Sequence, residues 1–153
     1  MKNIVSAEVR RLNYAVCETG EVYHTLYRAA GLSDSAGMIL YVLLENDGKC
    51  FLREIRHFTG MGKQTMNSAL RKLESDGIIK MESHSGERNK SAAFTSAGKK
   101  YAVKTVGKII KMENKIFSSW NKSDVESYLA LSELYLQSLR KKAEEFTSKN
   151  EHN

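Results

Sequence analysis

Residues 51–77 read FLREIRHFTGMGKQTMNSALRKLESDG, and this stretch decides the fold. Apolar side chains recur at helical spacing along one edge of its first part, at Leu52, Ile55 and Phe58. Residues 59–62 are typical of a tight turn, and a second helix is predicted over 63–76, ended by Gly77. Its inward positions are Met66, Ala69, Leu70 and Leu73. Two short helices joined by such a turn predict a helix-turn-helix.

The residues after this stretch predict a β-hairpin. Ile79 and Met81 alternate with polar neighbours, and Ala92 and Phe94 alternate in the same way, as residues of half-buried strands do. Residues 84–90 lie between them and form a polar loop with basic side chains. A hairpin that follows a helix-turn-helix is a wing, so the segment predicts a winged helix.

Two helices are expected before this motif, and the absence of proline leaves them uninterrupted. The first is predicted from about residue 6 to residue 30, and Gly31 ends it. Ser33 is expected to cap a second, largely buried helix over Asp34–Glu45, which a turn at 46–48 closes.

The chain is expected to return to helix beyond Gly98. One side of that helix carries Val103, Val106, Ile110 and Phe117. A capping box at 123–126 is expected to open a last helix that is apolar on more than one face. Because one small domain rarely covers such long helices, their surplus apolar surface predicts packing against a second copy of the chain.

These elements give the expected fold class, mainly α with a small β-hairpin. The expected organisation is a winged helix-turn-helix DNA-binding lobe over 33–97 and a helical dimerisation lobe built from 1–32 and 98–147. Residues 148–153 are expected to form a flexible tail.

The positive charge is concentrated in the middle of the chain. Residues 47–115 hold 15 of the 24 Lys and Arg residues but only 7 of the 18 Asp and Glu residues. A positive electrostatic field concentrated in one region attracts polyanions, and the Lys and Arg side chains displace condensed counterions from phosphates. A solvated basic face would look the same in composition, so the local sequence has to decide between the two.

The side chains of the helix over 63–76 favour DNA binding over a solvated basic face. Four polar side chains lie opposite its core positions, at i, i+3, i+4 and i+7: Gln64, Asn67, Ser68 and Arg71. In a major groove, Gln and Asn can bridge the N6 and N7 edge of adenine, Arg the O6 and N7 edge of guanine, and Ser either. Lys63 and Thr65 suit phosphates. An ordinary solvent-exposed face would more often carry Glu and Lys pairs.

The tip of the wing adds two candidate DNA contacts, Arg88 and Lys90. An Arg at this position can enter the minor groove and sense its width and negative potential. A solvated hairpin tip is the alternative, and the neighbouring helix-turn-helix favours DNA contact.

The element order and the phrase GKQTMNSALRKLE at 62–74 resemble the MarR family of transcriptional regulators. The similarity continues through the wing, at 77–79, 88–91, 94–95 and Gly98. The resemblance implies a bacterial, cytoplasmic homodimer whose recognition helices enter successive major grooves of a pseudopalindromic operator. It implies repression that a small phenolic or other effector relieves, and it places the recognition residues and the wing arginine on the positions named above.

Two positions depart from the pattern of the family. The family usually has an Asp two residues before the wing Arg to brace it, and Gly86 stands there instead. Gly62 replaces the usual Asn or Ser cap of the recognition helix, at a cost of a few tenths of a kcal/mol.

Enzymatic function is not expected. The sequence has no Ser/His/Asp grouping, no paired carboxylates at a plausible spacing and no glycine-rich cofactor loop, so neither catalysis nor a cofactor is indicated.

Cys17 and Cys50 lack the spacing of metal ligands or of a disulfide pair, and both are expected to be buried. The sequence around Cys17 does not match the oxidant-sensing branch of the family.

The expected partners are double-stranded DNA, a second copy of the chain and a small-molecule effector. No membrane is expected, since no run of about 18 apolar residues occurs, and the lack of an export signal favours the cytoplasm. The alternative hypothesis is a winged-helix module that binds protein and has no specific DNA readout.

Overall fold

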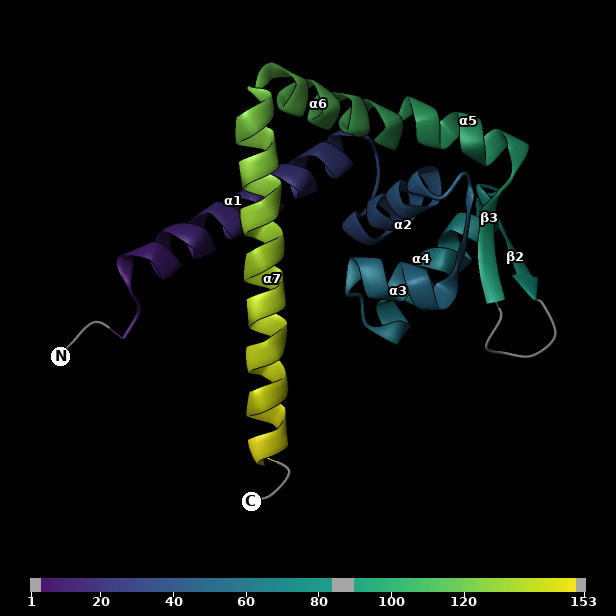
Figure 1. Cartoon of the computed structure of the whole chain (residues 1–153). Coiled ribbons are helices and arrows are strands. Elements are labelled where there is room, and N and C mark those ends of the chain that lie inside the picture. The colour runs from purple at the N-terminus through teal and green to yellow at the C-terminus, as the bar shows by residue number, and fades with distance from the viewer. Residues whose placement is uncertain (1–3, 84–89, 151–153) are drawn as a thin grey trace. The chain divides into compact units, whose positions relative to one another are not determined.

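The computed structural model describes residues 4–83 and 90–150, with side chains up to residue 148. These residues form seven helices and three strands (Figure 1). In chain order they are α1 (Ala7–Ala29), α2 (Asp34–Glu45), β1 (Lys49–Phe51), α3 (Leu52–Thr59), α4 (Lys63–Ser75), β2 (Ile79–Ser83), β3 (Lys90–Phe94), α5 (Ser96–Lys104), α6 (Val106–Ser119) and α7 (Lys122–Asn150). The expected fold class, mainly α with a small hairpin, is confirmed. The chain divides into two compact units, 1–110 and 111–153.

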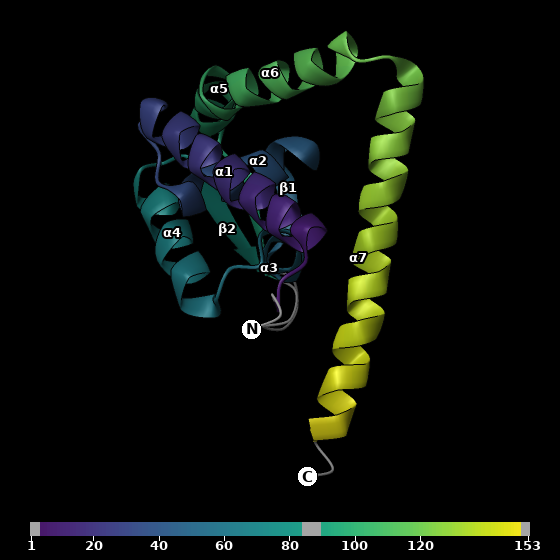
Figure 2. The same ribbon diagram turned by 90° about the vertical axis from the view of Figure 1, so that its left-hand side faces the viewer.

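The core of the first unit is built around α2. Ile39, Leu40 and Leu43 are completely buried in it. The helix packs against α1, α3, α4 and α5, and Figures 1 and 2 show α4 and α5 on different sides of it. A helix that is apolar around much of its circumference is stable only when neighbours cover it on several sides, as they do here.

The hairpin belongs to a three-stranded antiparallel sheet with the order β1-β3-β2. β2 and β3 are the predicted strands, and β1 is an addition that the sequence pattern did not predict. It pairs Cys50 with Ala92 and leads directly into α3. The sheet therefore connects both ends of the helix-turn-helix to the wing, because β1 precedes α3, β2 follows α4, and both strands pair with β3.

The predicted helix ends are mostly confirmed. The hydroxyls of Ser6 and Ser33 accept hydrogen bonds from the N–H groups of Val9 and Ala36 and so cap α1 and α2. Gly31 and Gly77 have φ angles of +74° and +71°, which glycine adopts without strain, and they follow α1 and α4.

Two expectations about burial are wrong. Phe58 is 64% exposed in the last turn of α3, where Ile55 is the buried residue of the helix. Cys17 is exposed in the middle of α1, and the buried residue of this helix is Tyr27, near its C-terminal end. Cys50 is buried as expected, and burial together with Glu54 raises the pKa of its thiol to about 11.

The C-terminal helices also differ from the prediction. The single helix expected after Gly98 is two helices that meet at Thr105, because the φ and ψ of Thr105, −107° and −87°, interrupt the helix. Val103, expected on the apolar side, is exposed. Gly98 lies inside α5. The capping box at 123–126 is wrong, because α7 has already begun at Lys122 and the carbonyl of Asn121 accepts the N–H of Asp124.

The second unit, 111–153, holds the end of α6 and α7. Phe117, Trp120 and Tyr128 form an aromatic cluster at the corner between them, with ring centroids 5.6–6.3 Å apart. α7 carries a long series of exposed apolar side chains beyond this corner: Leu129, Leu131, Leu134, Tyr135, Leu136, Leu139 and Phe146.

Candidate nucleic-acid interface

α4 turns a polar face to solvent because its apolar face is held in the core. Met66, Ala69, Leu70 and Leu73 are all buried. The predicted site residues lie on the rest of the helix: Lys63, Gln64, Thr65, Ser68 and Arg71 are exposed and Asn67 is half-buried. By helical spacing, Gln64, Ser68 and Arg71 point most directly away from the buried side.

The turn between α3 and α4 is fixed by local hydrogen bonds. Gly60 has a φ of +64° and ends α3, with its N–H donating to the carbonyl of Arg56. The Thr59 hydroxyl donates to the carbonyl of Ile55 at 2.7 Å and accepts from the N–H of Met61 at 3.4 Å. Gly62 begins α4 without a side-chain cap, and the first turn of α4 has no acidic residue. The N–H groups in the first turn of α4 therefore have no side-chain acceptor, and this positive helix end suits an anion.

Beside this turn lies a basic hollow that the sequence pattern did not single out. Its volume is about 480 Å³, and its lining comprises Arg53, Arg56, His57, Gly60, Met61 and Gly62. Arg53 lies over the Phe51 ring, 5.4 Å from its centroid. The signal available in the sequence was the run of basic residues on the polar side of α3.

The base of the wing is held by a cluster of three charges. Glu82 on β2 pairs with Lys49 of β1 at 2.6 Å and with Lys80 at 2.7 Å. Hydrogen bonds from these two lysines lower the pKa of Glu82 to about 2. Lys90, a predicted site residue, is exposed at the start of β3, opposite Ser83. Arg88 and the rest of the loop at 84–89 lie outside the described residues.

The Glu82 cluster predicts a specific pH dependence of stability. The carboxylate is favoured in the folded chain, so the cluster stabilises the fold fully above the unfolded pKa near 4.5 and loses its effect as the pH falls toward 2. We therefore expect the difference in unfolding free energy between the wild type and Glu82→Gln to be constant above pH 5 and to shrink between about pH 4.5 and 2. Urea titrations across that range measure it. A difference that grows on acidification would contradict the ion cluster.

A second junction joins α4, the wing and α5. The Thr95 hydroxyl donates to the carbonyl of Gly77 at 2.6 Å and accepts from the N–H of Gly98 at 2.9 Å. The Thr95 N–H donates to the carbonyl of Ile78 at 3.0 Å. Glu74 adds a contact, since its carboxylate accepts from the N–H of Met81. These bonds place α4 and the wing strands in one arrangement.

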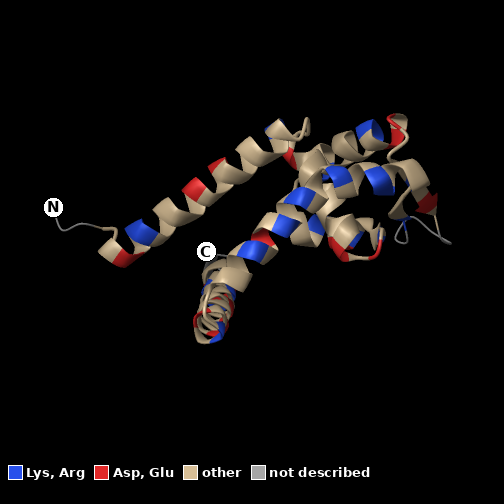
Figure 3. Cartoon of the chain, turned by 90° about the horizontal axis from the view of Figure 1, so that it is seen from above, with Lys and Arg blue, Asp and Glu red and all other residues tan. Residues whose placement is uncertain are grey.

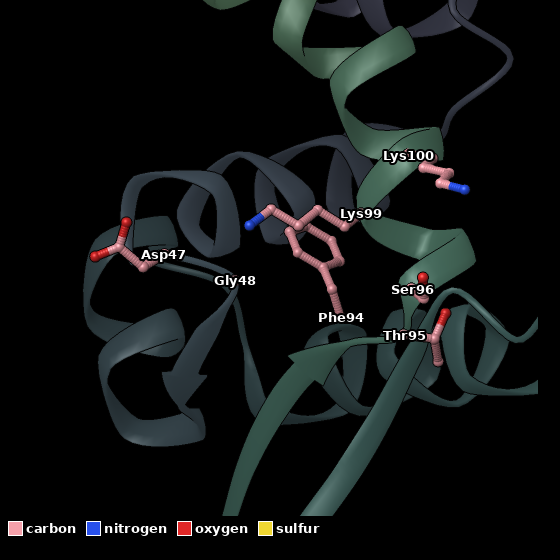
Figure 4. Close-up of a pocket in the computed structure, with 7 residues that line it drawn as sticks. All are labelled: Asp47, Gly48, Phe94, Thr95, Ser96, Lys99 and Lys100. Carbon is pink, nitrogen blue, oxygen red and sulfur yellow. The ribbon is translucent and has the colours of Figure 1, made fainter.

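No group of three His, Cys, Asp or Glu side chains in the described part of the chain could hold a metal ion. A hollow of about 310 Å³ lies at the start of α5, lined by Asp47, Gly48, Phe94, Thr95, Ser96, Lys99 and Lys100 (Figure 4). No helix among the described residues is long and apolar enough to cross a bilayer.

Comparison with known proteins confirms the resemblance seen in the sequence. A model of the MarR family matches residues 30–88, which include the helix-turn-helix and most of the wing. The HTH-type transcriptional regulator FL11 of Pyrococcus horikoshii is 47% identical over 38 residues. That match spans a quarter of this chain and a quarter of the length of the curated relative.

Solved structures share the fold over nearly the whole chain at low identity. The MarR family regulator NMB1585 of Neisseria meningitidis has a TM-score of 0.80 at 18% identity, over 92% of this chain and 99% of that one. MepR of S. aureus, in a complex with DNA, has a TM-score of 0.68 at 18% identity, over 90% and 99%. NadR, in complex with 4-hydroxyphenylacetate, has a TM-score of 0.66 at 18% identity, over 90% and 94%.

Proposed function

We propose that this chain is a winged-helix member of the MarR family and acts as a homodimeric, sequence-specific DNA-binding regulator of transcription in the cytoplasm. Members of that family are transcription regulators and not enzymes. α4 would lie in the major groove and the wing at 84–90 in the minor groove of a pseudopalindromic operator. The observation that carries the proposal is the polar face of α4, which presents Gln64, Ser68 and Arg71 beside a basic turn.

The side chains divide by chemistry into two groups. Gln64, Asn67, Ser68 and Arg71 have the donors and acceptors for base edges. Phosphate contacts fall to Lys63 and Thr65, to Lys90 beside the wing, and to Arg53, Arg56 and His57 around the basic hollow. Arg88 is proposed as the minor-groove residue. Because phosphate contacts position a protein and base contacts specify the sequence, the two groups have separable effects on binding.

Selection of bound duplexes from a randomised library tests the proposed operator. A dimer with one α4 per half-site should enrich two inverted half-sites whose centres lie about 10–10.5 bp apart, one turn of B-DNA. Enrichment of no sequence would contradict specific readout and favour a winged-helix module that binds protein.

The second copy is proposed from exposed apolar surface. Leu131 is 65% exposed on α7 and Tyr14 is 69% exposed on α1, each among further exposed apolar residues. Such surface is typical of an interface that a partner covers. We propose that 33–97 is the DNA-binding lobe and that 1–32 with 98–147 forms the dimerisation lobe. A stable homodimer interface buries at least about 1,200 Å² in total, which helices of this length can supply.

Charges placed on the apolar side of α7 should separate the dimer. We expect Leu131→Glu/Tyr135→Glu to weaken dimerisation at least about 30-fold, because the partner would desolvate two carboxylates that have no counter-ion. Sedimentation velocity at micromolar concentration measures it. Ala130→Glu/Gln137→Glu adds the same charge on the polar side of α7 and should remain dimeric. A monomeric wild type would contradict the dimer.

We further propose that the protein represses transcription and that an effector releases it from DNA. The support is a structural neighbour, NadR, whose structure holds 4-hydroxyphenylacetate. Small phenolic acids are therefore the first probes to add to the protein–DNA complex. Release of DNA by such a probe, at concentrations that also raise the melting temperature of the free protein, is the expected result.

A further inference from the structure

A second basic surface lies on α5 and α6, separate from the α4 face. Residues 96–119 hold six lysines and a single acidic residue, Glu113. Figure 3, which views the chain from above these two helices, shows blue positions along both. Three of these lysines, all exposed and all in the first unit, make up what we call the outer lysine row: Lys100, Lys104 and Lys108.

The row follows from helical spacing. Lys100 and Lys104 are four residues apart on α5, opposite the buried Gly98 and Ala102. Lys108 lies in the first turn of α6, away from the buried Val106 and Ile109. The step of four residues separates Lys100 and Lys104 by about 6 Å along the axis of α5.

The charges of the row are available to a partner. Among the residues that the structure describes, the ion pairs with carboxylates involve His24 and other lysines, and none involves the three lysines of the row. Lys99 is not a member, because it points differently. Figure 4 shows it leaning over the Phe94 ring in the hollow that Asp47 also lines, while Lys100 points to the other side of α5.

We propose that the outer lysine row binds the phosphate backbone of a second segment of double-stranded DNA. This inference rests on the proposed function, in which α4 holds the first segment. α5 and α4 pack on different sides of α2, so the part of the row on α5 does not share a surface with the α4 face. One bound protein would then contact two DNA segments, its operator through α4 and any other duplex through the row.

The chemistry of the row favours DNA over other anionic partners. All three residues are Lys, a point charge without the planar fork that Arg uses for bidentate base contacts, so the expected binding is independent of sequence. A duplex offers the dense negative charge that a group of exposed lysines without carboxylate partners attracts. An anionic lipid surface also attracts exposed lysines, and Val103 is 49% exposed on α5, so phosphatidylserine vesicles serve as a competitor in the experiment.

A two-duplex capture experiment tests the proposal. The full chain is bound to an immobilised duplex from its own upstream region, washed, and offered a fluorescent duplex of scrambled sequence over a range of salt concentrations. We expect capture of the second duplex, weakening steeply with salt. Lys100→Gln/Lys104→Gln/Lys108→Gln should retain the first duplex within about twofold and lower the salt slope for the second by about three, one per lysine.

A matched variant separates the row from net charge. Lys122→Gln/Lys141→Gln/Lys142→Gln removes three exposed lysines from α7 and should capture the second duplex as the wild type does. The proposal is overturned if the wild type captures none, if both variants lose capture equally, or if phosphatidylserine vesicles displace the second duplex through the same three lysines of the row.

The outcomes also separate this inference from the proposed function. If the protein binds the first duplex but captures no second duplex, the proposal for the outer lysine row is overturned and the proposed function is not. If the immobilised duplex holds no protein, the proposed function fails. The variants are then compared on the scrambled duplex directly, where the row still predicts the same loss of salt slope and an unchanged slope would overturn it.

Discussion

Gly98→Ala is expected to destabilise the first unit by about 3 kcal/mol, the largest effect of any single substitution considered. A Cβ at Gly98 would overlap the carbonyl group of Ile78, which is backbone and cannot rotate away as a side chain can. That carbonyl already accepts the N–H of Thr95, and the Thr95 hydroxyl accepts the N–H of Gly98. Any shift that relieves the overlap therefore breaks the junction between α4, the wing and α5.

Urea unfolding of the two proteins measures this loss, with Gly20→Ala as the control. Gly20 lies within α1, and a Cβ there meets nothing within 4 Å, so its replacement should be neutral or stabilising by up to about 1 kcal/mol. Equal stabilities of Gly98→Ala and the wild type would show that α5 does not approach Ile78 as described.

Arg71→Ala is expected to bind the operator about 5- to 150-fold more weakly, the loss of one bidentate base contact worth roughly 1–3 kcal/mol. Arg71 is exposed on the face of α4 opposite Met66, Leu70 and Leu73, so its removal leaves the core intact. The unfolding free energy should stay within about 0.5 kcal/mol of the wild type, as for ordinary surface substitutions.

The neighbouring lysine provides the control for charge. Lys72 is also exposed, but it pairs with Asp76 at 2.8 Å and lies beside the polar stripe. Lys72→Ala should weaken binding to native and scrambled duplexes by the same small factor, whereas Arg71→Ala should lower the preference for the native duplex. A folded Arg71→Ala protein that binds the operator as the wild type does would remove Arg71 from the base contacts.

The winged helix was largely predictable because its signals are local. The spacing of Met66, Leu70 and Leu73 fixes which side of α4 is buried, and the position of Gly77 fixes where the chain leaves the helix. The same periodicity predicts that Gln64, Ser68 and Arg71 are exposed, and they are. Their contacts with DNA are a prediction, which the comparison of Arg71→Ala with Lys72→Ala tests.

The features that were missed depend on tertiary contacts. β1 has three residues, too few for an alternating pattern, and becomes a strand only because β3 pairs with it. Gly98 resembles a loop glycine in the sequence, and the reason for it is the approach of Ile78 from another element. Phe58 and Cys17 fit apolar positions but lie where the chain itself supplies no cover.

The central claim is sequence-specific DNA binding through α4, and fluorescence anisotropy tests it most directly. The protein is titrated against its own upstream duplex and a scrambled duplex of equal length, each at low and near-physiological salt. We predict tight, salt-sensitive binding that favours the native duplex by at least about 10³-fold and that Arg71→Ala reduces. Equal, weak binding of wild-type protein to both duplexes would contradict the account.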